Sequence, residues 1–154
     1  MIVFVIGPSK AGKTEATKAL VEDSCLWPPG VEIARFDLDH ELGPANRGIG
    51  ERAVECCGSL GARNHANRIL LVDVGAGQLV SSVFRRYLQH SNAYPARTVV
   101  VDCGEKTFRE RHGENAPNEV RRYYGPGSLE NLWHEARQAG LCVDSSGPHK
   151  PTEW

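Results

Sequence analysis

Residues 1–21 read MIVFVIGPSKAGKTEATKALV, and this stretch decides which fold the rest of the chain can adopt. Its first six residues are apolar and partly β-branched, which is typical of a strand buried on both faces of a parallel sheet. Residues 7–14, GPSKAGKT, match the pattern G-x-x-x-x-G-K-[ST], and residues 14–21 continue with helical character. A strand, a glycine-rich loop and a helix in this order predict a site that wraps around phosphate groups.

The glycine-rich loop, residues 7–14, is predicted to hold a nucleoside triphosphate. Its glycines let backbone N–H groups point at phosphate oxygens, and the following helix adds its positive end. We expect Lys13 to reach the β- and γ-phosphates and the Thr14 hydroxyl to ligate Mg²⁺. A purely structural glycine-rich turn is the alternative. The predicted nucleotide-binding positions of the loop are Gly7, Pro8, Ser9, Lys10, Ala11, Gly12, Lys13 and Thr14.

Length, charge and cysteine spacing narrow the class of protein. A chain of 154 residues predicts one domain, residues 1–154, with a proper core. The 18 Lys+Arg against 19 Asp+Glu give a net charge of −1, which argues against general binding to nucleic acid or to an anionic membrane. No apolar run approaches the roughly 18 residues of a membrane span, and no signal peptide is recognisable. The five cysteines form no C-x-x-C pair, so we expect reduced thiols in a cytoplasmic protein.

Strands alternate with helices along the sequence, which predicts an α/β sheet. After the first strand, further strands are expected at residues 31–36, 68–74, 97–102 and 141–144. Helices are expected at residues 13–23, 50–64, 79–89, 105–112, 118–124 and 129–139, with loops near 43–48 and 113–117 and a tail from 145 to 154. Together these elements predict a three-layer P-loop NTPase fold, nucleotide-kinase-like, with a five-stranded parallel sheet.

Asp37 and Asp39 form an acidic pair at the carboxyl end of the second predicted strand. Ligands of open α/β sheets bind in the crevice outside these strand ends. One carboxylate could hold Mg²⁺ through water while the other accepts the proton of a substrate hydroxyl. The alternatives are a solvated acidic turn in which Asp39 caps a short helix, and a metal cluster that includes His40 and Glu41.

Asp73 ends the third predicted strand, whose residues 69–73 read ILLVD. Apolar residues followed by an acid are typical of a strand whose carboxylate orients Mg²⁺ through water. A buried acid without such a partner is costly, which favours the functional interpretation. Gly75, Ala76 and Gly77 follow, and we expect them to let a ligand approach the backbone closely.

Arginines cluster around a loop that contains glycine, asparagine and proline. Arg109 and Arg111 lie on one predicted helix, and Arg121 and Arg122 begin the next. This pattern predicts a mobile lid over about residues 109–122, which closes on the phosphates and shields the transfer from water. A solvated basic face is the alternative.

The chain resembles the small P-loop kinases of metabolites and nucleotides, above all shikimate kinase and its gluconate-kinase-like relatives. The resemblance rests on the order of landmarks: residues 7–14, the D-x-D at 37–39, Arg63, residues 75–77, the lid arginines and the VDSSG at 143–147. It implies that Asp39 contacts the accepting hydroxyl and that Asp37 is a Mg²⁺ partner. It further implies that Arg63 contacts a substrate anion, that Arg109 stacks on adenine, and that Arg121 or Arg122 clamps the phosphates.

The sequence departs from this family where the family's substrate is held. The phenylalanine that should precede the substrate arginine is Ala62, and the acid that should follow it is Ala66. We therefore expect a kinase that uses ATP and Mg²⁺ to phosphorylate a hydroxyl of a small metabolite other than shikimate. The alternatives are a nucleoside or nucleotide kinase and a P-loop regulatory ATPase without kinase activity. A monomer or a homodimer is expected.

Overall fold

Five parallel strands form one sheet in the order β2-β3-β1-β4-β5. The computed structural model describes residues 1–43, 47–94, 96–115, 117, 118, 120, 138 and 141–145. The strands are β1 (Ile2–Ile6), β2 (Glu32–Asp37), β3 (Arg68–Val74), β4 (Thr98–Asp102) and β5 (Leu141–Asp144). The prediction of an α/β fold with a five-stranded parallel sheet is confirmed.

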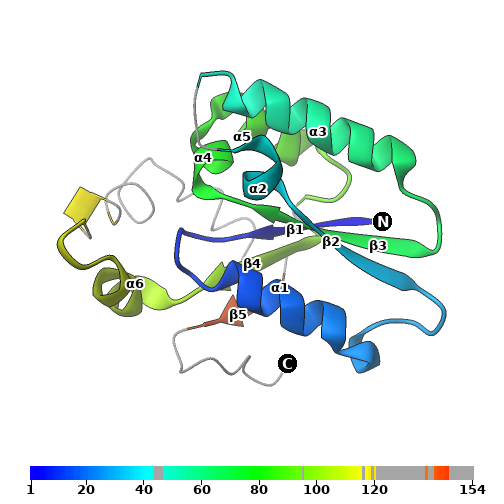
Figure 1. The fold of residues 1–154 in the computed structure, drawn as a ribbon, viewed down its shortest axis with the longest axis horizontal. Coiled ribbons are helices and arrows are strands. Elements are labelled where there is room, and N and C mark those ends of the chain that lie inside the picture. Colours follow the sequence, from blue (N-terminus) through cyan, green and yellow to red (C-terminus); the bar gives the residue numbers. More distant parts are fainter. Residues whose placement is uncertain are drawn as a thin grey trace.

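Helices lie on both faces of this sheet (Figure 1). The longer helices are α1 (Lys13–Glu22), α3 (Ile49–Arg63), α5 (Ser82–His90) and α6 (Gly104–His112). The short ones are α2 (Leu38–Leu42), α4 (Ala76–Val80) and the 3₁₀ turns η1 (Ser24–Leu26) and η2 (Gly113–Asn115). Helix α1 covers one face, and α3, α4 and α5 lie on the other (Figure 1). This arrangement is compatible with the expected three layers.

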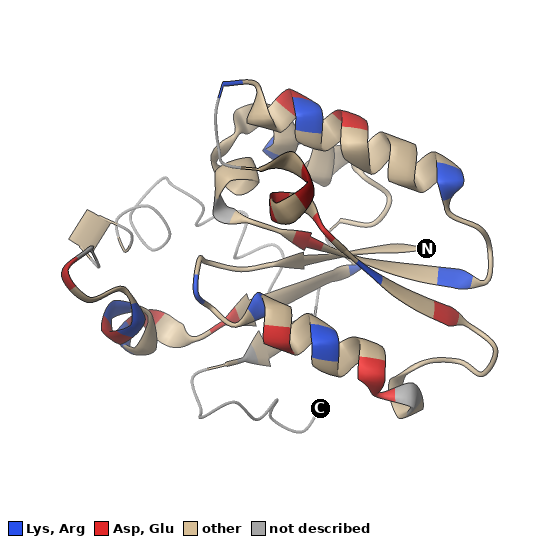
Figure 2. Ribbon diagram, in the orientation of Figure 1, with Lys and Arg blue, Asp and Glu red and all other residues tan. Residues whose placement is uncertain are grey.

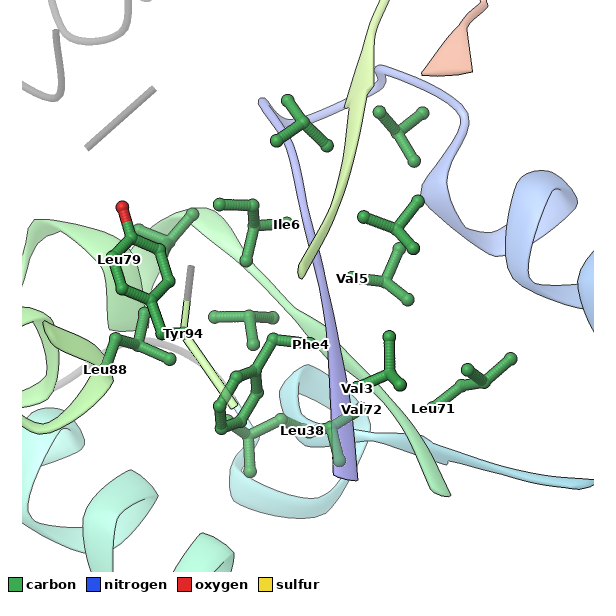
Figure 3. Close-up of a cluster of buried hydrophobic side chains, with 14 of the residues drawn as sticks. Val3, Phe4, Val5, Ile6, Leu38, Leu71, Val72, Leu79, Leu88 and Tyr94 are labelled. Carbon is green, nitrogen blue, oxygen red and sulfur yellow. The ribbon is translucent and has the colours of Figure 1, made fainter. Parts of the chain in front are cut away.

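The core forms around the central strand β1, which is buried between α1 on one side and the α3–α5 side on the other. Successive strand residues point to opposite faces, so both faces of β1 need apolar side chains. Phe4 and Ile6 point toward Leu79 and Leu88, whereas Val5 lies on the opposite side of the strand (Figure 3). All five of these side chains are buried. The continuous apolar run at the start of the sequence is therefore explained by two covered faces.

The sheet order places the glycine-rich loop at a topological switch point. The chain leaves β1 through the loop and α1 and reaches β2 at one edge, while β4 pairs with the other side of β1. Crossovers in opposite directions open a crevice at the carboxyl ends of the strands. In the register of β2 with β3, Asp37 lies opposite Asp73, so two of the predicted site acids come to this crevice together.

The single helix predicted for residues 79–89 is wrong. Two helices, α4 and α5, meet at Ser81, whose side chain accepts a hydrogen bond from the Phe84 N–H at 3.5 Å. A hydroxyl at this position competes with helical backbone bonding and starts a new helix. Gly50 of α3 lies against the Ser81 side chain, and a Cβ at Gly50 would overlap it.

Several sequence predictions fall outside the described residues. They are most of the helices predicted at 118–124 and 129–139, the tail after residue 145, and the lid residues Arg121 and Arg122. In the part of the chain that the structure describes, no helix is both long and apolar enough to cross a bilayer.

Candidate functional site

The glycine-rich loop curls between β1 and α1. Gly12 has φ 92°, a left-handed conformation that glycine adopts without steric cost. Lys10 has φ 60°, which is uncommon for a residue with a side chain. The Ala11 N–H donates to the Pro8 carbonyl at 3.2 Å, which closes the turn before α1 begins at Lys13. The backbone thus takes a local shape that can surround an anion.

The Lys13 ammonium folds back onto the loop that it follows. Its Nζ donates to the carbonyls of Gly7 at 3.0 Å and Pro8 at 2.9 Å. Burial lowers the pKa of Lys13, although the carboxylates of Asp39, Asp73 and, more weakly, Asp37 oppose that shift. The ammonium is therefore held close to three acids and bonded to neutral oxygens, a place from which it can reach an incoming phosphate.

Asp73 is buried at the end of β3, with 4% of its surface exposed. Its Oδ1 accepts a hydrogen bond from the Thr17 hydroxyl at 2.5 Å, and its Oδ2 lies 2.6 Å from Nη2 of Arg35. Burial raises the pKa of Asp73, whereas the bonds from Thr17 and Arg35 act to lower it. Both oxygens of this acid are thus engaged by side chains that the sequence analysis did not single out.

Arg35 was not predicted as a site residue, yet it connects the predicted acids. Besides its bond to Asp73, its Nη2 lies 3.0 Å from Oδ2 of Asp37 and 3.5 Å from the Thr14 hydroxyl. The signal was present in the sequence, because residues two apart on a strand share a face and Arg35 precedes Asp37 by two. A basic residue on a mostly apolar strand beside an acidic pair would have indicated this bridge.

Asp37 and Asp39 have different surroundings. The Asp37 carboxylate caps α2 by accepting the His40 N–H at 3.0 Å, so the alternative in which Asp39 caps this helix is wrong. Asp39 lies within the first turn of α2 and faces Gly75, where a Cβ would overlap its carboxylate. The sequence analysis expected Gly75 to admit a ligand, and the structure shows that its missing side chain makes room for Asp39.

A pocket of about 290 Å³ opens above the glycine-rich loop. Half of the predicted site residues line it, together with Glu15, which was not predicted. The lining residues are Ser9, Lys10, Gly12, Lys13, Thr14, Glu15, Asp37, Asp39, Asp73 and Gly77. Acidic positions at the end of β3 and on α2 face basic positions in the loop and at the start of α1 (Figure 2). The pocket therefore offers both signs of charge to a ligand.

Thr14, Asp37 and Asp73 were predicted as the metal ligands. Their hydroxyl and carboxylate oxygens are the hard donors that Mg²⁺ takes, and Mg²⁺ usually needs only one or two carboxylates besides substrate phosphates. The donor set therefore fits this ion in kind, although Arg35 lies among the donors. Within the described ranges no three His, Cys, Asp or Glu residues come close enough to form a protein-only metal site, so a cluster that includes His40 and Glu41 is not formed.

The predicted lid arginines that the structure describes are already bonded to the protein. Arg109, predicted to stack on adenine, pairs with Glu105 one helical turn earlier at 2.5 Å. Arg111 donates to the carbonyl of Lys10 at 2.9 Å, and Lys10 in turn donates to the carbonyl of Arg111 at 3.1 Å. The end of α6 is thereby tied to the glycine-rich loop. Arg121 and Arg122 lie outside the described residues.

Arg63 does not belong to this pocket, contrary to the prediction. It is the last residue of α3, and the next residue, Asn64, donates from its side chain to the carbonyl of Met1. Met1 lies at the amino-terminal end of β1, whereas the pocket is at the carboxyl end. Helix α3 begins near the pocket and carries Arg63 roughly 20 Å away along its length. No pattern in the sequence alone reveals at which end of the sheet this helix finishes.

Ala76 and Gly77 were predicted to bind substrate together with Gly75. Gly77 lines the pocket, and both residues belong to the short helix α4, which starts at Ala76. The stretch that was expected to let a ligand approach the backbone closely therefore caps and begins a helix.

No model of a known protein family matches the chain, and a comparison with curated protein sequences finds no match.

Proposed function

We propose that the chain is an ATP-dependent phosphotransferase, a P-loop NTPase of the nucleotide-kinase-like type, which phosphorylates a hydroxyl of a small molecule. The observation that carries the proposal is one pocket in which a curled glycine-rich loop, Lys13 and the acids Asp37, Asp39 and Asp73 come together. A phosphate-binding loop accounts for the first two features. It does not account for Asp39, an acid beside the loop that is free of any capping role.

In the proposed reaction the loop amides and Lys13 bind the β- and γ-phosphates. The acceptor oxygen forms a bond to the γ-phosphorus as the bond from that phosphorus to the β–γ bridging oxygen breaks and ADP leaves. Asp39 takes the proton of the acceptor hydroxyl. Thr14 with Asp37 or Asp73 would hold Mg²⁺, which supplies positive charge at the phosphates.

The pocket supports positioning and charge stabilisation as the main contributions. Phosphoryl transfer requires little covalent chemistry from the protein, so aligned cations and excluded water supply most of the acceleration. The pocket volume of about 290 Å³ lies at the lower end of the range for small ligands.

The first test is a panel of hydroxyl compounds scored for acceptor-dependent ADP release from Mg-ATP. With an active acceptor, Lys13→Ala should lower kcat by about 10²-fold or more, because a charge at the transferred phosphate is lost. Lys18→Ala, on the exposed side of the same helix, is the matched control and should keep full activity. ADP release that no acceptor accelerates would indicate the regulatory ATPase, and equal activity of both variants would remove Lys13 from the mechanism.

Asp39 and Asp37 provide a second test, because they are proposed to act differently. Asp39→Asn should lower kcat by roughly 10²–10⁴-fold with ATP affinity nearly unchanged, since an amide cannot accept the proton. Asp37→Asn should instead raise the Mg²⁺ requirement, because an amide is a poorer ligand for a hard cation. If added Mg²⁺ rescues both variants alike, the base is another residue.

A further inference from the structure

Arg35 occupies the centre of the group of oxygens that would hold the metal. Its Nη2 lies 2.6 Å from Asp73 Oδ2, 3.0 Å from Asp37 Oδ2 and 3.5 Å from Thr14 Oγ1. These are the three side chains whose donor chemistry fits Mg²⁺. A single guanidinium nitrogen therefore stands among the same atoms that a divalent cation would bind.

We infer that Arg35 is an internal competitor of Mg²⁺ for Asp37 and Asp73, and that it sets how strongly nucleotide binding depends on the metal. This inference rests on the proposed function, in which the site uses Mg²⁺ with a nucleotide. It goes beyond that function because it assigns a specificity-determining role to a residue outside the glycine-rich loop and outside the acidic pair.

The two cations compete when they use the same carboxylate oxygens, because two positive charges brought this close repel each other. Mg²⁺ requires near-octahedral ligands at about 2.0–2.1 Å, whereas the guanidinium already takes one oxygen of each acid at hydrogen-bond distance. A guanidinium remains protonated in proteins, so Arg35 cannot relieve the conflict by losing its charge. Ligation of Mg²⁺ by these carboxylate oxygens is therefore weakened for as long as Arg35 keeps its contacts with them.

Charge and exposure make such an exchange physically reasonable. Arg35 contributes one positive charge against two carboxylates, so the acids are only partly neutralised by it. Its side chain keeps 24% of its surface exposed, compared with 6% for Asp73, so the arginine can leave more easily than the buried acid. The acid is the fixed partner of this contact, and the cation is the exchangeable one.

The alternative is that Arg35 is a permanent structural partner of the two acids. Mg²⁺ would then be held only by Thr14 and the nucleotide phosphates. The two cases differ in what happens when the guanidinium is removed. A competitor weakens metal binding, so its loss strengthens that binding; a permanent partner only orients the acids, so its loss leaves metal binding unchanged or weaker.

The test uses Mn²⁺ as a spectroscopic substitute for Mg²⁺, titrated at pH 8 into the nucleotide-free protein and followed by the electron paramagnetic resonance signal of unbound Mn²⁺. Arg35→Gln should bind Mn²⁺ about tenfold or more tightly than the wild type, because the cation that occupies one oxygen of each acid is gone. Mn²⁺ should also raise the Tm of Arg35→Gln more than that of the wild type. Unchanged or weaker Mn²⁺ binding by this variant would overturn the inference.

Two further variants keep the test decisive. Arg68→Gln removes the same charge from an arginine that pairs with Glu32 at 3.1 Å at the amino end of β3, and its Mn²⁺ affinity should equal that of the wild type. If Arg35→Gln does not fold, Arg35→Lys is titrated with Mn²⁺ in its place. A lysine ammonium lacks the second donor, Nε–H, with which Arg35 also bonds Asp73 Oδ2 at 2.8 Å, so it holds the acids less firmly and Mn²⁺ binding should be tighter than in the wild type. Unchanged binding by Arg35→Lys would overturn the inference.

A nucleotide titration separates this inference from the proposed function. The affinity for a fluorescent ADP analogue is measured in excess Mg²⁺ and in EDTA. The ratio of the affinity in Mg²⁺ to the affinity in EDTA should be larger for Arg35→Gln than for the wild type. If no nucleotide binds under either condition, the proposed function fails while the Mn²⁺ titration still tests Arg35. If nucleotide binds and the ratio is the same in wild type and variant, only the inference about Arg35 fails.

Discussion

Thr17→Val tests whether the buried acid Asp73 depends on its hydroxyl partner for stability. Thr17 is completely buried in α1, and its Oγ1 lies 2.5 Å from Asp73 Oδ1. Valine keeps the branched shape and removes only the donor. A hydrogen bond to a charged group contributes about 1.5–3 kcal/mol, and for a chain of this length each kcal/mol shifts the Tm by about 2–4 °C. We therefore expect Thr17→Val to lower the Tm by about 3–12 °C.

Thr98→Val is the matched control, because the same chemical change is made in a different environment. Thr98 is 2% exposed, and its Oγ1 has no hydrogen-bond partner among the residues that the structure describes. Replacing a hydroxyl without a partner by a methyl group should leave stability unchanged or increase it. Urea and thermal unfolding of both variants, followed by circular dichroism at pH 8, provide the comparison. Equal losses in the two variants would refute the argument.

The loss of stability in Thr17→Val is expected to depend on pH in a defined direction. Because burial raises the pKa of Asp73 above its unfolded value, the native state binds this proton more tightly than the unfolded chain does. The contribution of this group to stability is therefore full below the unfolded pKa and is lost as the pH rises through the native pKa. Thr17→Val removes a bond that lowers this pKa, so its destabilisation should grow with pH across that window and shrink in acid. A pH-independent difference would contradict the assignment.

Two other predictions concern glycines and thiols. Gly75→Ala should lower the free energy of unfolding by about 1–3 kcal/mol, since its Cβ would overlap the Asp39 carboxylate. Gly58→Ala, in the open middle of α3, should raise that free energy by about 0.5–1 kcal/mol. Equal effects of the two variants in urea unfolding would contradict this prediction. Iodoacetamide at pH 8 should label the exposed Cys25 long before Cys57, as followed by mass spectrometry. Burial raises the pKa of Cys57 to about 12, and the thiolate is the reactive form. Labelling of Cys57 at the rate of Cys25 would show that α3 opens readily.

The sequence predicted the strands and the sheet well because their signal is local. Residues 69–72 form an apolar run between Arg68 and Asp73, and the observed strand, Arg68–Val74, has the predicted limits. Helix boundaries were less predictable. Glycine has a low intrinsic helix propensity, yet α3 runs through Gly58 and Gly61, because its packing in the core and against α5 outweighs that preference.

The candidate site was predictable only where each residue follows its strand directly. Asp37 and Asp73 come together because parallel strands bring their carboxyl ends to one edge of the sheet, and sequence order alone implies this. Arg63 was misplaced because its position depends on which end of the sheet α3 reaches. Arg35 was missed because its partner Asp73 is 38 residues away along the chain and belongs to another strand. Pairings of this kind depend on register, which no short motif specifies.

The cations that contact the pocket's acids and loop, Lys13 and Arg35, are already bound by the protein's own oxygens, and this affects what a ligand must do to bind. Lys13 donates to the carbonyls of Gly7 and Pro8, and Arg35 bridges Asp37 and Asp73. A phosphate that draws Lys13 away from these carbonyls must replace their hydrogen bonds, so the gain is then a difference between two sets of contacts. The same reasoning applies to a metal at the carboxylates. In the proposed function, binding at this site is therefore an exchange of partners, and its affinity should depend on Arg35 and the loop carbonyls as well as on the groups that touch the ligand.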